Sequence, residues 1–215
     1  MKRSSASTLR GLYAITDTSL CPDEVLTANV EQALLGGCRI LQYRDKRADT
    51  EKRRSLAQQL KGLCLRYQAL LIINDDIELA QAVAADGVHL GSSDPDPTHA
   101  RQILGEHAII GVSCYNRLDL AIAAADQGVD YIAFGRFHPS LTKPAAVAAK
   151  PELLRQARQA LDLPLVAIGG ITPENGGPLI EAGADMLAVI HGIFGQPDIR
   201  AASQRLSDLF EPKET

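Results

Sequence analysis

The feature that most limits how this chain can fold is a series of short apolar segments repeated along its whole length. Each segment is continuously apolar, as is typical of a strand buried on both faces of a parallel sheet. The eight segments are Leu12–Ile15, Ile40–Tyr43, Leu70–Ile73, Gly87–Leu90, Ile109–Val112, Tyr131–Phe134, Leu165–Ile168 and Met186–Ile190. The sequence therefore predicts eight parallel strands.

Helical patterns separate these segments. Glu51–Tyr67 carries leucines at helical spacing on one face and offers Lys and Arg to the other. Asn116 is predicted to begin another helix. Thr172 followed by Pro173 predicts an N-cap with proline at the first helical position. The chain is thus expected to alternate strands and helices.

Eight strand–helix units in 215 residues fit either a closed (β/α)8 TIM barrel or an open doubly wound sheet. An open sheet often carries G-x-G-x-x-G after its first strand, where this chain has the sequence Thr-Asp-Thr-Ser at 16–19. Polar residues instead follow many different strands, which favours a barrel. We predict one α/β barrel domain over 11–210, with a disordered leader at 1–10 and a frayed tail at 211–215.

Composition narrows the function classes. The chain is 46% apolar but only 4% aromatic, so its core must be aliphatic. Its 22 basic and 26 acidic residues give a net charge of -4, which argues against general nucleic-acid binding. No apolar run approaches the roughly 18–20 residues of a membrane span. Four widely spaced cysteines have no zinc-like spacing and indicate reduced core thiols, so we expect a cytoplasmic protein.

Basic residues follow the second predicted strand. Alternation along a strand directs Gln42, Arg44 and Lys46 to the same side. Two cations and an amide at a barrel mouth suit a phosphate or diphosphate. The alternative is a solvated strand end in which an Arg pairs with an Asp.

Carboxylates follow the third and fourth predicted strands. In a barrel, Asp75 and Asp94 reach the same rim, and two carboxylates with further oxygen donors can hold Mg²⁺ beside substrate phosphates. The alternative is a local structural role. Asp75 or Asp76 could cap a helix beginning near Ile77, and Asp94 could turn the chain.

The later strand ends carry further candidates. Ser113 adds a hydroxyl at the rim, and Lys143 lies in the longest strand-to-helix connection, which is either a binding loop or an exposed surface loop. Gly169 and Gly170 follow strand seven and His191 follows strand eight, where many barrels bind phosphate. His89, within a strand, is expected to be a structural residue with its hydrogen bonds satisfied.

Taken together, these segments resemble the thiamine phosphate synthase family. The resemblance runs in register from about Gly11 to Phe194. It rests on the stretches GLYAITD (11–17), QYRDK (42–46), IIND (72–75), ADGVHLG (85–91), GVS (111–113), SLTK (140–143), AIGGIT (167–172) and AGAD (182–185).

The resemblance implies a barrel that joins a hydroxymethylpyrimidine diphosphate to a thiazole phosphate, releasing diphosphate and, with a carboxylated thiazole, CO₂. It assigns Mg²⁺ to Asp75 and Asp94. It assigns the pyrimidine diphosphate to Gln42, Tyr43, Arg44, Asp45, Lys46, Asn74, Ser113 and Lys143. It assigns the thiazole phosphate to Ser140, Leu141, Thr142, Gly170, Ile190 and His191. Arg44, Lys46, Ser113 and Lys143 are the implied catalytic residues.

Two positions depart from the family pattern. Ser140 stands where the family commonly has Thr, which keeps a hydroxyl, and His191 stands where it commonly has Ser, which puts that side-chain contact in question. The expected partners are these small-molecule substrates, with no nucleic acid and no membrane, and a homo-oligomer is left open. The rival functions are a thiazole phosphate tautomerase on the same fold and a non-catalytic sensor of thiazole or thiamine phosphate.

Overall fold

A computed structural model describes residues 9–47, 49–91, 94–139 and 147–211. It forms a closed barrel in which parallel strands pair in chain order and β8 pairs with β1. The strands are β1 (Gly11–Ile15), β2 (Ile40–Tyr43), β3 (Leu70–Asn74), β4 (Gly87–Leu90), β5 (Ile109–Tyr115), β6 (Tyr131–Gly135), β7 (Leu165–Ile168) and β8 (Met186–Val189). The (β/α)8 prediction is confirmed.

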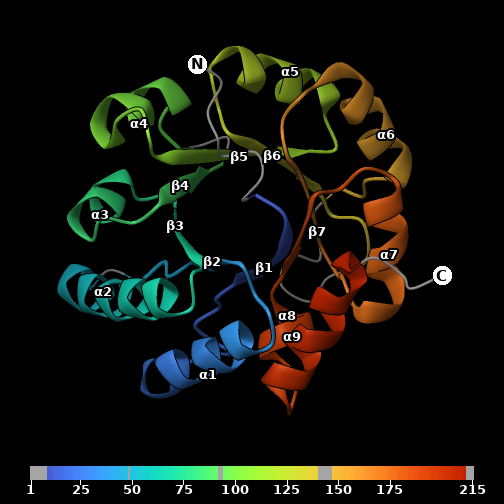
Figure 1. Ribbon diagram of the computed structural model, residues 1–215. Helices are drawn as coiled ribbons and strands as arrows, with labels where there is room; N and C mark the ends of the chain where they lie inside the picture. Colours follow the sequence, from blue (N-terminus) through green and yellow to red (C-terminus); the bar gives the residue numbers. More distant parts are fainter. Residues whose placement is uncertain (1–8, 48, 92–93, 140–146, 212–215) are drawn as a thin grey trace.

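Helices surround the strands in an outer ring (Figure 1). They are α1 (Asp23–Leu35), α2 (Thr50–Arg66), α3 (Ile77–Ala82), α4 (Pro97–Leu104), α5 (Leu118–Asp126), α6 (Pro151–Ala160), α7 (Pro173–Glu181), α8 (His191–Phe194) and α9 (Ile199–Ser207), followed by the 3₁₀ helix η1 (Asp208–Phe210). Thr172 caps α7 as predicted, in a capping box with Asn175. The predicted start of a helix at Asn116 is wrong, because α5 begins one residue later, with Arg117 at the N-cap.

The core has two layers. An aliphatic layer lies between the strands and the helices, and a smaller one fills the barrel interior. Leu9, which the sequence analysis placed in a disordered leader, is 1% exposed and packs in the interior layer. The packed chain therefore begins before residue 11. The rest of the leader that precedes Leu9 and the tail from 212 lie outside the described residues.

Three aspartates form the same tie at the amino ends of β4, β6 and β8. Asp86, Asp130 and Asp185 each accept a hydrogen bond from a backbone N–H of the preceding strand, at 2.8 Å. Each aspartate also forms an ion pair with a Lys or Arg from the helix that comes before β3, β5 or β7, respectively. The three pairs are Lys61–Asp86, Arg101–Asp130 and Arg158–Asp185. These aspartate ties join successive strand–helix units.

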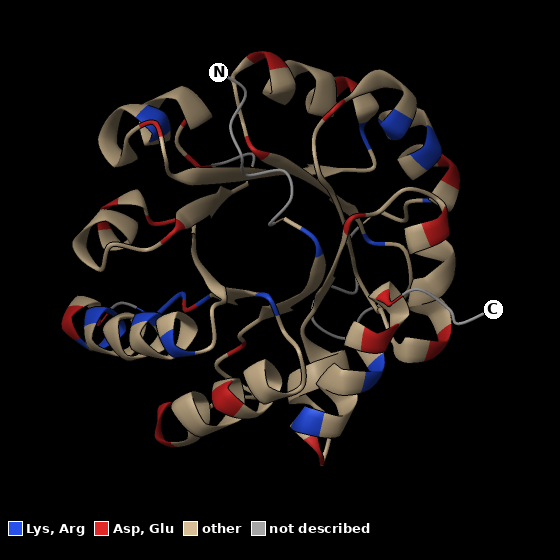
Figure 2. Cartoon of the chain, in the orientation of Figure 1, with Lys and Arg blue, Asp and Glu red and all other residues tan. Residues whose placement is uncertain are grey.

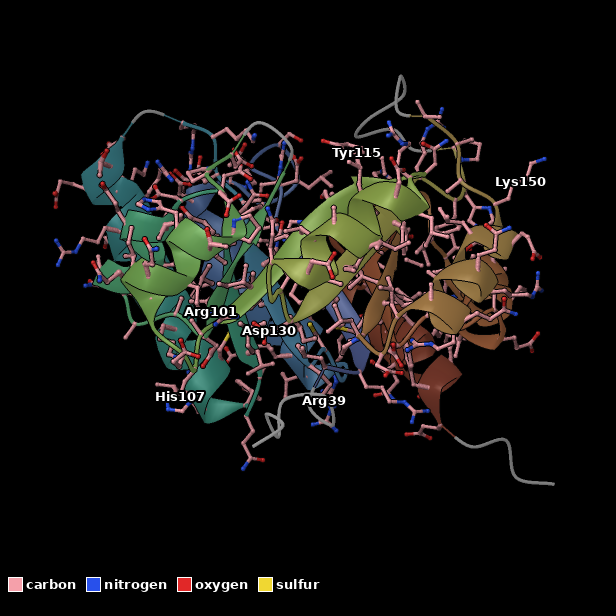
Figure 3. The ribbon with its side chains drawn as sticks, turned by 90° about the horizontal axis from the view of Figure 1, so that it is seen from above. Arg39, Arg101, His107, Tyr115, Asp130 and Lys150 are labelled. Carbon is pink, nitrogen blue, oxygen red and sulfur yellow. The ribbon has the colours of Figure 1, made fainter. Side chains whose placement is uncertain are left out.

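Charge is distributed according to this layering. Figure 2 shows acidic and basic residues on the helices and near the strand ends, while most of the strand ring is uncharged. Seen from the side, Arg101 and Asp130 lie toward the opposite end of the barrel from Tyr115 and Lys150 (Figure 3). Among the described residues, no helix combines the length and apolar character needed to cross a membrane.

Candidate active site

A cavity of about 330 Å³ opens at the carboxyl ends of the strands. All eight strands or the residues just after them contribute to its lining, including Tyr115 at the end of β5. The predicted site residues that line it are Gln42, Arg44, Asn74, Ser113, Gly170, Ile190 and His191. Residues distant in sequence thus converge on one space, as the barrel geometry requires.

A second, charged cavity of about 280 Å³ adjoins the first. Asn74 lines both cavities, so the two spaces are neighbours at the end of β3. In the charged cavity, Lys46 Nζ lies 2.9 Å from Asp75 Oδ2. Arg44 lines the main cavity, where its guanidinium lies 4.0 Å from Asp17 Oδ2 and its backbone N–H donates to Thr16 Oγ1 at 2.9 Å. An anion that enters here therefore meets cations already held near carboxylates.

Asp75 and Asp94 are brought together, as predicted. Their carboxyl groups lie close enough to shift each other's pKa, and Asp94 Oδ2 accepts the Gly91 N–H at 2.6 Å. Burial opposes ionisation of Asp75, but Lys46 and Asp94 lower its pKa below the ordinary value. Burial and the nearby Asp75 carboxylate raise the pKa of Asp94, despite the Gly91 N–H. Two crowded carboxylates of this kind favour a shared proton or a bound cation.

The alternative that Asp75 or Asp76 caps a helix holds for Asp76 and not for Asp75. Asp76 is the N-cap of α3, and its carboxylate accepts the Leu79 N–H at 2.8 Å. Asp75 makes no cap, because its φ of 65° places it in the left-handed region and turns its carboxylate toward Lys46. Asp75 is thus available to a ligand and Asp76 is structural.

The acidic pair has the donor chemistry of a magnesium site completed by substrate. Within the described ranges, no group of three or more His, Cys, Asp or Glu side chains could enclose a metal ion. Mg²⁺ commonly takes one or two carboxylates and fills its other positions with phosphate oxygens and water. Asp75 and Asp94 fit that requirement beside a diphosphate.

Tyr43 and Asp45 face away from the main cavity. Tyr43 packs in the outer core layer, and its hydroxyl donates to Asp45 Oδ2 at 3.1 Å. Asp45 also pairs with Arg47, which in turn binds Asp23. The alternation that directs Gln42 and Arg44 into the barrel directs these two residues outward. Asp45 lines the charged cavity, whereas Tyr43 lines neither cavity.

Four predicted residues, Ser140, Leu141, Thr142 and Lys143, lie outside the described residues. The part of the loop that precedes them approaches the turn after β7 closely. A Cβ on Gly170, whose φ is 61°, would lie 2.2 Å from the Pro139 carbonyl oxygen. A Cβ on Gly169 would lie 2.3 Å from Arg136 Cβ. The packing of this loop therefore requires both glycines.

Several cavity residues were missed by the sequence analysis. Tyr13, His89 and Arg136 line the main cavity, and Tyr131 lies beneath it. His89 does have both ring nitrogens hydrogen-bonded, as expected of a structural residue, but it is also part of the cavity wall. One sequence signal was available at Gly111, where a Cβ would lie 1.9 Å from Tyr131 Cζ. A glycine inside a strand often marks such a close approach.

Comparisons with known proteins agree with this arrangement. A family model described as thiamine monophosphate synthase matches residues 12–193. A thiamine-phosphate synthase of Nitrosococcus oceani is 55% identical over 198 residues, covering 92% of this chain and 91% of the relative. One of Thioalkalivibrio sulfidiphilus is 50% identical over 203 residues, covering 94% and 96%.

Among solved structures, a thiamine phosphate pyrophosphorylase from Pyrococcus furiosus superposes with a TM-score of 0.86 at 35% identity, covering 94% of this chain and 96% of that one. A 3-hexulose-6-phosphate synthase superposes with a TM-score of 0.72 at 16% identity, which shows the shared barrel alone. The matched model spans most of the described barrel and every residue that lines the two cavities except Gln196. The chain belongs to the thiamine monophosphate synthase family.

Proposed function

We propose that this protein is a thiamine phosphate synthase that transfers a pyrimidinylmethyl group from its diphosphate to the nitrogen of a thiazole phosphate. The observation that carries this proposal is the junction of the two cavities at Asn74. A charged space suited to a leaving diphosphate there lies next to a space of about 330 Å³, which we assign to the two heterocycles. A bond broken at that junction would separate anion from carbocation.

The proposed chemistry is a dissociative substitution. Arg44 and Lys46 neutralise the leaving diphosphate, and Lys143 is the further cation implied by the family motif. Mg²⁺, held by Asp75 and Asp94, would add charge neutralisation on the diphosphate when bound. The electron-rich pyrimidine stabilises the methylene cation, so the protein needs only to position the thiazole nitrogen opposite it.

The thiazole phosphate would occupy the side of the main cavity formed after β7 and β8. Gly170, Ile190 and His191 line this side. The His191 ring packs over Gly195, where a Cβ would lie 2.7 Å from Nε2. We therefore assign the phosphate contact at this position to the backbone, which keeps it compatible with the loss of the serine common in the family.

Four free, buried cysteines agree with a reducing cytoplasmic location.

Product analysis separates the proposed reaction from its rivals. Purified protein is incubated with the pyrimidine diphosphate, the thiazole phosphate and Mg²⁺, and both thiamine phosphate and diphosphate are measured. A synthase forms the two products in equal amounts. A tautomerase would isomerise a carboxylated thiazole phosphate without releasing diphosphate, and a sensor would bind ligand without turnover. The cationic segment and the acidic pair favour the synthase.

The loop lysine provides a sharper test. Lys143→Ala is expected to lower kcat by about 10²–10³-fold, the scale of one lost electrostatic donor. Lys150→Ala is the matched control, since Lys150 is an exposed lysine at the end of the same connection. Equal turnover by the two variants at saturating substrate would remove Lys143 from the mechanism.

A further inference from the structure

A chain of hydrogen bonds crosses the barrel beneath the main cavity. Gln42 Nε2 donates to Tyr13 Oη at 2.8 Å, and Tyr13 Oη lies 2.8 Å from Tyr131 Oη. His89 Nδ1 lies 2.9 Å from Tyr131 Oη, and His89 Nε2 lies 2.9 Å from Ser113 Oγ. We call these five residues, which come from five different strands, the hydrogen-bond chain.

The centre of the hydrogen-bond chain is buried and held by contacts between rings. Tyr13 and Tyr131 are 1% and 0% exposed, and their rings meet edge to face at 6.0 Å. The His89 ring stacks on Tyr131 with centroids 5.6 Å apart. Burial raises the pKa of both tyrosines well above the ordinary value, so each phenol keeps its single proton. Each tyrosine can therefore donate only one hydrogen bond.

Because each tyrosine donates only once, the hydrogen bonds of the hydrogen-bond chain all run in one donor-to-acceptor direction. Because Gln42 donates to Tyr13, the Tyr13 proton is directed to Tyr131. Tyr131 must then donate to His89 Nδ1, which leaves the imidazole proton on Nε2. Since Nε2–H donates to Ser113 Oγ, the Ser113 proton is left for the cavity.

We propose that Tyr131 is a positioning residue that holds His89 in its Nε2–H tautomer and thereby makes the Ser113 hydroxyl a donor to an anionic oxygen in the cavity. The identity of that oxygen, on the leaving diphosphate, rests on the proposed function. The tautomer does not depend on it. If the Gln42 amide were reversed, every bond would reverse, and Ser113 would donate to His89 and could only accept from a ligand.

The test is ¹⁵N NMR of the histidine side chains in the ligand-free protein, with His89 assigned from the spectrum of His89→Asn. In the wild type, Nδ1 is expected at the shift of a bare imidazole nitrogen and Nε2 at that of a protonated one. In Tyr131→Phe the two shifts should move toward each other, because Nδ1 has lost its donor. A wild-type spectrum with the proton on Nδ1, or an unchanged His89 in Tyr131→Phe, overturns the proposal.

Two further variants separate direction from packing. Tyr13→Phe keeps Tyr131 beside His89 but removes the donor that directs the Tyr131 proton to Nδ1, so the two His89 shifts should move toward each other there as well. An unchanged His89 spectrum in Tyr13→Phe would also overturn the proposal. Tyr67→Phe removes a surface hydroxyl bonded to Glu31 and is the control. In turnover assays, Tyr131→Phe should lower kcat/KM for the pyrimidine diphosphate by about tenfold, the scale of one lost hydrogen bond, while Tyr67→Phe leaves it unchanged.

The two hypotheses can fail separately. An inactive wild-type protein that shows the Nε2–H tautomer would refute the proposed function and leave the role of Tyr131 intact. An active wild type in which His89 carries its proton on Nδ1 would refute the role of Tyr131 alone.

Discussion

Replacing Asp130 tests how strongly the aspartate ties hold the barrel. The Asp130 side chain is 6% exposed, and its Oδ2 accepts from Ile110 N at 2.8 Å and from Arg101 at 2.7 Å. Asp130→Ala leaves the buried Ile110 N–H without this acceptor, which costs about 1–3 kcal/mol. It also removes the carboxylate that faces the Arg101 guanidinium.

The total cost can be bounded from these contacts. Breaking a buried ion pair from one side typically costs about 3–5 kcal/mol. Arg101 retains hydrogen bonds to the carbonyls of Gly105, Ala108 and Gly128, so its charge is not left without partners. We therefore expect Asp130→Ala to lower the free energy of unfolding by about 3 kcal/mol, at the low end of that range.

Urea denaturation at neutral pH measures this loss as a lower midpoint with an unchanged slope. Asp119→Ala is the matched control, because Asp119 also pairs with an arginine, Arg117, but is 62% exposed, and its midpoint should barely move. Below the new midpoint, Asp130→Ala should keep the wild-type kcat, since Asp130 lies toward the far end of the barrel from the cavity (Figure 3). Equal midpoints for the two variants would refute the reasoning.

Three further outcomes are expected. Asp75→Asn should raise the Mg²⁺ concentration needed for half-maximal activity by about tenfold or more. Asp76→Asn keeps a good N-cap residue and should leave that concentration unchanged. Identical Mg²⁺ titrations for the two variants would contradict the assignment of Asp75 to the metal and Asp76 to the helix cap. Gly111→Ala should lower the thermal midpoint sharply, because its Cβ would meet the Tyr131 ring at 1.9 Å. Although burial opposes its ionisation, Asp45 has its pKa lowered to about 2 by hydrogen bonds, mainly from Arg47. Its stabilisation is thus complete above the unfolded-state pKa of about 4 and is lost as pH falls toward 2, so unfolding free energy should depend less on pH across that window in Asp45→Asn.

The strands could be predicted closely because burial on both faces leaves continuous apolar runs. Three predicted strands match the structure and four differ from it by one residue at one end, while β5 continues three residues further, through Tyr115, which lines the main cavity. The helix start after β5 was misplaced because Asn is a preferred cap residue, while Arg117 occupies the cap without a side-chain bond.

The site was less predictable because the direction of a strand side chain depends on the register around the barrel. Alternation correctly grouped Gln42 with Arg44 at the main cavity, but Lys46, predicted on the same side, lines the charged cavity beside Asp45. The family motif also included Tyr43, which packs in the outer core layer. Tyr131 and His89 belong to apolar strands, and nothing in those strands distinguishes an inward polar residue from a structural one. Their significance depends on contacts between strands, which a single sequence does not contain.

The aspartate ties also imply an order of local opening. They recur at the amino ends of β4, β6 and β8, so each of these strands is hydrogen-bonded through its aspartate to the strand before it, β3, β5 or β7. At the corresponding position before β2 stands Arg39, whose N–H bonds the Leu12 carbonyl but which has no carboxylate to offer. In native proteins, amide hydrogens exchange through the cooperative opening of contiguous units that often coincide with supersecondary motifs. The β1–β2 pair should therefore exchange its amide protons with solvent before the rest of the barrel does.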